Sequence, residues 1–166
     1  MDIKIYAVDN KNFLFFKNID EEYSFEELHK ILKTFKCFES KNINQIGHIT
    51  CEKLLYNKEN SKRNVKKIYY LCGNRSVDVK DNDNDGYGLL ENKEINKNYV
   101  NFINDFDFDK ELSLYGTDNI IKEWQEMNIT YTEDEIRTGK EFIETIKKAF
   151  NYAYDNGLNL IWEYQY

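Results

Sequence analysis

The residues most suggestive of chemistry lie between Asp81 and Asn92, where the sequence reads DNDNDGYGLLEN. Acidic residues at alternate positions followed by a glycine match the first half of an EF-hand loop, whose oxygen ligands occupy positions 1, 3 and 5. Asp81, Asp83 and Asp85 fall on those three positions, and Gly86 falls on position 6. This half of the pattern predicts a calcium site.

The second half of the loop does not fit an EF-hand. Position 12 requires a bidentate glutamate, but Asn92 stands there and Glu91 lies one place early. We therefore expect no standard EF-hand, and a polar turn in which Asn, Asp and Gly supply unusual backbone angles is the favoured interpretation. A module with a loose calcium site at residues 81–91 stays as an alternative.

The two histidines provide the next candidates for chemistry. His48, in the sequence GHIT, has the residue type of a general base or a phosphate contact, but its His-x-Thr pattern occurs once. His29 lies at the edge of an apolar helical stripe, which favours a structural role. Nucleophile-elbow, P-loop and dinucleotide-binding glycine motifs are absent from the sequence. We expect no enzyme, with a small enzyme or nucleotide-binding protein using His48 as the alternative.

The three cysteines, Cys37, Cys51 and Cys72, are odd in number and widely spaced. A zinc site would combine them with His48, but structural zinc sites normally include a close Cys pair, which is missing here. Reduced thiols fit better than a disulfide framework. The sequence thus predicts no metal and no other cofactor. It has no leader-like N-terminus and no membrane-length apolar run, so we expect a cytoplasmic protein.

Charge is unevenly distributed along the 166 residues, whose net charge is −7. Residues 78–126 contain thirteen acids and five lysines, whereas residues 1–77 are net basic. A strong negative field attracts cations or a basic protein and repels nucleic acid and anionic membranes. The basic run at residues 58–67 lacks a recognised nucleic-acid-binding motif. A solvated acidic face is the plainer alternative to a binding surface.

The acidic middle of the chain favours a protein-binding domain that docks a basic partner, and the oligomeric state is left open. Immunity proteins that neutralise toxin nucleases, and inhibitors of nucleic-acid-binding defence proteins, are of this physical type. Tyrosine is a frequent anchor of such interfaces, while charges set encounter rate and register. The expected contacts mix acids with an exposed ring: Asp81, Asp83, Asp85, Tyr87, Glu91, Asp105, Asp107 and Asp109.

Apolar periodicity and capping residues indicate the elements that position these side chains. Two capping boxes, Ser24 with Glu27 and Thr132 with Glu135, mark the starts of the two main helices, and Gly157 is suited to end the second. The other expected elements are a strand hairpin at 3–9 and 12–18, strands near 45–51 and at 65–73, an acidic loop at 74–94, short helices within 96–112 and 117–127, and a final strand at 158–166.

This order predicts a single α+β domain over residues 1–166, with an acidic central insertion at about 74–112. A length of 166 residues and an apolar content of 41% suffice for one core. We expect a mostly antiparallel sheet, packed on one face by the two main helices, with the C-terminal helix followed by a final strand.

Overall fold

The computed structural model describes residues 2–19, 23–42, 75–79, 82–110 and 132–165. For residues 75–79, 82–86, 164 and 165 it describes the backbone alone. The elements are β1 (Asp2–Val8), α1 (Asn10–Lys17), α2 (Phe25–Leu32), β2 (Lys36–Ser40), β3 (Arg75–Val79), β4 (Asn82–Leu90), the 3-10 helix η2 (Asn92–Glu94), α4 (Lys97–Asn104), α7 (Glu133–Asn156) and β5 (Asn159–Gln165).

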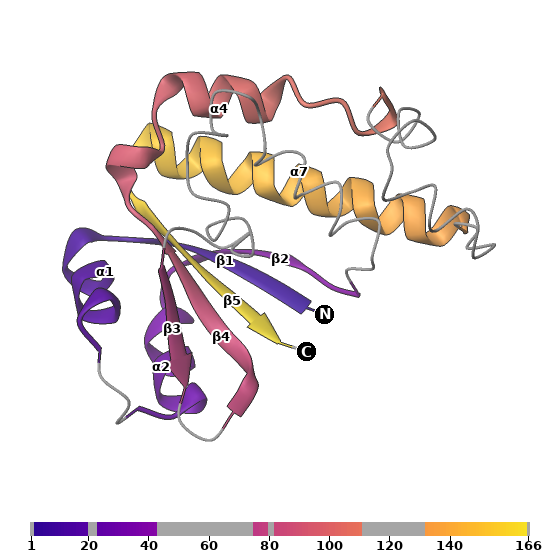
Figure 1. The fold of residues 1–166 in the computed structure, drawn as a ribbon. Coiled ribbons are helices and arrows are strands. Elements are labelled where there is room, and N and C mark those ends of the chain that lie inside the picture. The colour runs from indigo at the N-terminus through magenta and orange to yellow at the C-terminus, as the bar shows by residue number, and fades with distance from the viewer. Residues whose placement is uncertain (1, 20–22, 43–74, 80–81, 111–131, 166) are drawn as a thin grey trace.

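These strands form a five-stranded sheet in the order β2-β1-β5-β4-β3, and every neighbouring pair is antiparallel. The C-terminal strand β5 therefore occupies the centre of the sheet, between β1 and β4 (Figure 1). Asp2 pairs with Gln165, which brings the two ends of the described chain together at one end of the sheet. The predicted α+β class, the antiparallel sheet and the final strand after the C-terminal helix are confirmed.

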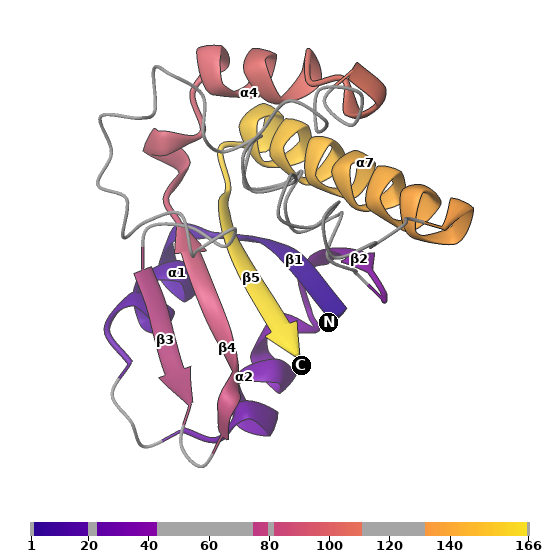
Figure 2. The same cartoon turned by 45° about the vertical axis from the view of Figure 1, so that its right-hand side comes forward.

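One face of the sheet is covered by α7, and α4 lies alongside α7 (Figures 1 and 2). The apolar stripe that helical spacing predicts along α7 forms this core: Ile136 is partly buried, and the other members are buried, namely Phe142, Ile143, Ile146, Ala149, Phe150 and Ala153. Ile3 and Ile5 of β1 and Leu160 and Trp162 of β5 pack against these helix residues from the sheet. The stripe follows from helical spacing, which places residues three and four apart on the same side.

The other face is covered by α1 and α2 through a second core cluster. Phe13 and Phe16 of α1 and Leu28 and Leu32 of α2 are its helical members. Side chains alternate between the two faces along each strand, and those that face α1 and α2 complete this cluster: Tyr6, Val8, Tyr87, Leu89 and Ile161. The two main predicted helices, α2 and α7, thus lie on opposite faces of the sheet instead of sharing one.

The starts of both main helices, and the end of α7, lie where the capping residues predict them. Ser24 and Glu27 form a capping box at the start of α2, and Thr132 and Glu135 form another at the start of α7. Gly157 ends α7 with a φ of 62°, a left-handed conformation that glycine adopts without steric cost. None of the described helices has the length and apolar character needed to cross a membrane.

The expected strand at 12–18 is wrong, because this segment is helix α1. Asp9 is its N-cap, and its carboxylate accepts hydrogen bonds from the backbone and side-chain nitrogens of Asn12. Phe13 and Phe16 are spaced three apart and both face the sheet. The sequence DNKN at residues 9–12, which would form the turn of the expected hairpin, is thus a helix start. An Asx residue favours both structures, and the short apolar run did not discriminate between them.

The acidic loop expected at 74–94 is also corrected. Residues 75–79 and 82–90 are β3 and β4, a hairpin that belongs to the sheet. The glycines that suggested a loop lie in β4, where Gly88 stands opposite Trp162 of β5. A large ring beside a strand glycine compensates for its missing side chain. The strands expected near 45–51 and at 65–73, and the helix at 117–127, lie outside the described residues.

We predict that Phe150→Ala lowers the free energy of unfolding by about 3–5 kcal/mol, because the ring is 1% exposed and the cavity it leaves would remain unfilled. Tyr154→Ala is the matched control on the same helix, because that ring is 42% exposed. Its expected cost is under about 1 kcal/mol. Urea denaturation of the three proteins measures both values, and equal costs would contradict the assignment of the stripe to the core.

Candidate functional site

Three of the predicted partner-binding residues lie together after α4. Asp105, Asp107 and Asp109 are exposed, whereas the intervening Phe106 is half-buried and Phe108 is buried. Asp107 accepts a hydrogen bond from the backbone nitrogen of Lys110 at 3.1 Å. The alternation therefore directs the carboxylates to solvent and the rings to the core, which anchors this acidic segment.

The acidic segment borders a groove of about 440 Å³ against α7. Lys140 of α7 forms an ion pair with Asp109, at 2.7 Å from Nζ to Oδ1. Glu144 and Lys147 of α7 also line the groove and form an ion pair with each other. Four carboxylates and two lysines thus face this groove, which leaves it net negative.

Tyr87, expected as an exposed interface anchor, is fully buried, and the expectation of an exposed ring is wrong. Its hydroxyl donates a hydrogen bond to the backbone oxygen of Phe25 at 3.2 Å. The ring stacks on Phe25 and meets Phe16 edge-on. Because β4 is a strand beside β5, its alternation turns Tyr87 into the core under α1 and α2.

The remaining predicted residues are not gathered with the acidic segment. Glu91 is half-buried and forms ion pairs with Lys17 and Lys93, and hydrogen bonds from these two lysines lower the pKa of its carboxyl. Its negative charge is therefore balanced by two lysines of the same chain. Asp83 and Asp85 belong to β4, of which only the backbone is described at those positions, and Asp81 lies outside the described residues.

A second group of charged side chains, outside the predicted contact set, surrounds a buried carboxylate on β5. Glu163 has a fully buried side chain. Lys4 Nζ donates to its Oε1 at 3.1 Å, and His29 Nδ1 lies 2.7 Å from its Oε2. The His29 ring also stacks parallel to Phe25, one turn earlier on α2. This triad joins β1, α2 and β5 on the face of the sheet opposite α7.

The thiol of Cys37 and the phenol of Tyr6 lie beside this triad, and they are cross-strand neighbours that are hydrogen-bonded to each other. Burial, followed by the negative charge of Glu163, raises the pKa of Tyr6. Burial of the sulfur likewise raises the pKa of Cys37, although the Tyr6 hydrogen bond opposes this shift. Both groups are therefore protonated at neutral pH, so Cys37 is a poor nucleophile.

The arrangement around Glu163 fixes the orientation of His29. An ionised carboxylate only accepts hydrogen bonds, so Nδ1 of the ring is the donor and Nε2 is turned away from Glu163. A partly exposed imidazole oriented by a buried acid has the form of a general base. One sequence signal pointed here: Glu163 follows Ile161 on the same side of an apolar strand, at a position that alternation makes internal.

Metal ligation finds no support among the described residues, where no three His, Cys, Asp or Glu side chains come together as a metal site. Cys37 is a free cysteine. The other members of the zinc set considered above, His48, Cys51 and Cys72, lie outside the described residues, as does the basic run at 58–67.

Comparison with known proteins gives a match to the fold. No family model matches the chain, and no curated protein matches it. Among solved structures, the chain is similar to the crystal structure of YfbM from Escherichia coli, described as a protein of unknown function. The TM-score is 0.62 at 15% sequence identity, over 98% of this chain and 99% of that chain. The overall fold of this chain is therefore similar to that of YfbM.

We predict that replacing Lys4 lowers the free energy of unfolding more than neutralising Glu163 does. Lys4→Met keeps the aliphatic stem but leaves a fully buried carboxylate with one partner, and we expect a loss of about 2–4 kcal/mol in unfolding free energy. Glu163→Gln removes the buried charge itself. Lys4 and His29 are 23% and 34% exposed, so water can solvate them, and the expected loss is about 1–2 kcal/mol.

The double variant Lys4→Met with Glu163→Gln serves as the control. Without the buried charge, the lysine substitution should cost less than it does alone, giving a favourable coupling in a double-mutant cycle. Urea denaturation at pH 7 measures all four proteins. Strictly additive losses would contradict the ion pair as described.

Proposed function

We propose that this chain is a small cytoplasmic protein-binding domain that inhibits a basic partner, such as a toxin nuclease or a nucleic-acid-binding defence protein. The observation that carries the proposal is the placement of Asp105, Asp107 and Asp109. All three are exposed on a segment that Phe108 and the half-buried Phe106 hold against the core. Fixed charges lose little entropy when a partner binds, which favours association.

The groove beside the acidic segment suggests how a basic partner is engaged. Its volume of about 440 Å³ and its net negative lining suit lysine or arginine side chains that extend from the partner. The ion pair between Lys140 and Asp109 is exposed, so an incoming guanidinium can exchange with the lysine at little cost. With Tyr87 in the core, the anchoring rings would come from the partner.

We predict that replacing Asp105, Asp107 and Asp109 together with Asn slows association with the basic partner by roughly tenfold at low salt, because electrostatic steering is lost. Stability should change little, because the three carboxylates are exposed. The partner is first isolated by affinity capture from the native host. Surface plasmon resonance across a salt series then measures association and dissociation separately.

The control variant carries Glu26→Gln, Glu39→Gln and Asp155→Asn. It removes the same charge at three exposed positions, none of which lines the groove. We expect its association rate to stay within about twofold of the parent. An association rate that is indifferent to salt and equal in both triple variants would show that the partner binds elsewhere, and would overturn the proposal.

A second candidate function is acid–base catalysis at His29. The observation that favours it is the 2.7 Å contact between His29 Nδ1 and the buried Glu163, which turns Nε2 outward. It ranks second because the grooves described at 440 and 570 Å³ are lined by other residues, and because Cys37 is held as a protonated thiol. The earlier enzyme alternative rested on His48, which lies outside the described residues.

If this second function holds, the protein should hydrolyse at least one member of a panel of p-nitrophenyl esters and phosphates, and His29→Gln should lower that rate at least about hundredfold. Lys30→Gln, a neighbouring exposed change, is the control and should leave the rate unaltered. No turnover, or turnover that survives His29→Gln, would exclude His29 as the base for these substrates.

A further inference from the structure

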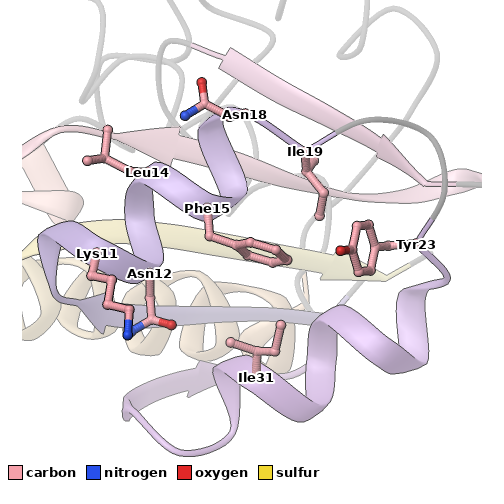
Figure 3. Close-up of a pocket in the computed structure, with 8 residues that line it drawn as sticks. All are labelled: Lys11, Asn12, Leu14, Phe15, Asn18, Ile19, Tyr23 and Ile31. Atoms are coloured by element: carbon pink, nitrogen blue, oxygen red, sulfur yellow. The ribbon is translucent and has the colours of Figure 1, made fainter.

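We propose that the groove between α1 and α2 binds a small apolar molecule that carries one carboxylate. The groove measures about 570 Å³, within the usual range of about 300–1,000 Å³ for small-molecule sites. It lies on the sheet face opposite α7, so it is separate from the acidic segment, and this inference is independent of the function proposed above. Its lining residues are Lys11, Asn12, Leu14, Phe15, Asn18 and Ile19, with Tyr23 and Ile31 (Figure 3).

The apolar part of the groove is built by both helices. Phe15 points from α1 toward Tyr23, and the two rings meet edge-on with centroids 5.5 Å apart (Figure 3). Ile31 of α2 faces them, and Ile19 lies next to Tyr23. All four side chains are half-buried, so part of their apolar surface is open to solvent. An apolar ligand that covers this surface gains the corresponding hydrophobic free energy.

The charge of the groove selects the polar end of the ligand. Lys11 lies at the end opposite Tyr23 and is the one charged residue among the described residues that line the groove (Figure 3). Lys11 forms no ion pair with a described residue. The nearby Asp9 carboxylate accepts hydrogen bonds from Asn12, and these, together with a smaller effect of the Lys11 charge, lower the pKa of Asp9. The described residues of the lining include this positive group and no acid, which complements an anion.

The size of the exposed apolar surface favours a small molecule over a protein. A stable protein interface involves about 20–30 residues on each side, whereas eight of the described residues line this groove. On this face, Leu14 is the large hydrophobic side chain that is exposed within the described part of the chain, at 51%. The other two, Tyr152 and Tyr154, belong to α7 on the opposite face.

Decanoate below its micellar concentration is the test probe, with binding measured by titration calorimetry and by amide chemical shifts. We expect a one-to-one complex whose shift changes lie in α1 and α2. Lys11→Gln should weaken decanoate binding about tenfold, the loss of one charge-assisted hydrogen bond. Lys30→Gln, an exposed lysine of α2 that does not line the groove, should leave the affinity unchanged. Decanol should bind the parent about as weakly as decanoate binds Lys11→Gln.

Leu14→Ser tests the apolar rim without disturbing the core, because this side chain is already half exposed. It should weaken decanoate and decanol alike. Failure of decanoate to bind, or binding that neither Lys11→Gln nor Leu14→Ser weakens, would overturn the proposal. Self-association in analytical ultracentrifugation that Leu14→Ser abolishes, without decanoate binding, would assign the groove to a second copy of the chain and also overturn it.

Discussion

The position of β5 at the centre of the sheet is the constraint on which the rest of the structure depends. This last strand pairs with β1 on one side and with β4 on the other, so these two strands join one sheet through it. Pairing residues 2–8 with 159–165 spans nearly the whole chain. Forming such long-range contacts requires loop-closure entropy before they are rewarded, which predicts slower folding than that of a helical bundle of the same size.

The entry into β5 is held by Asn159, a buried polar residue with every side-chain group engaged. Its oxygen accepts from the backbone nitrogen of Asn92 at 2.8 Å, and its nitrogen donates to Asn10 Oδ1 at 2.8 Å and to the backbone oxygen of Val8 at 3.4 Å. One side chain thus ties together the start of β5, the end of β1, the first turn of α1 and η2. Gly157 supplies the sharp reversal from α7 that makes this placement possible.

The central strand also gives the two sheet faces different chemistry. Leu160 and Trp162 extend the apolar core under α7, whereas Ile161 and Glu163 face α1 and α2. A buried glutamate is unfavourable unless its oxygens are paired, and Lys4 and His29 each take one of them. The helix α2 is consequently held by a directional contact as well as by Leu28 and Leu32. This contact fixes its rotation over the sheet.

The parts of the fold that the sequence predicted are those with strong local signals. Helix α7 runs for 24 residues with a capping box, a periodic stripe and a terminal glycine, so its limits and buried face followed directly. Helix α1 has eight residues, too few for helical and strand periodicity to differ clearly, so its sequence also fits the expected strand. The sequence of β4 predicts a loop, because Asn, Asp and Gly normally mark turns. The strand is stabilised by its pairing with β5, which lies far along the chain.

The candidate sites show the same difference between local signals, which the sequence reveals, and contacts between distant residues, which it does not. The acidity of residues 105–109 is a local property, and their exposure follows from their alternation with Phe106 and Phe108. The Glu163 triad joins residues 134 and 159 positions apart, and no local pattern contains that pairing. Because the acidic segment borders α7 while the triad and the apolar groove lie with α1 and α2, the sheet separates them. Substitutions in either layer therefore act on one surface at a time, provided that the strand between them stays paired.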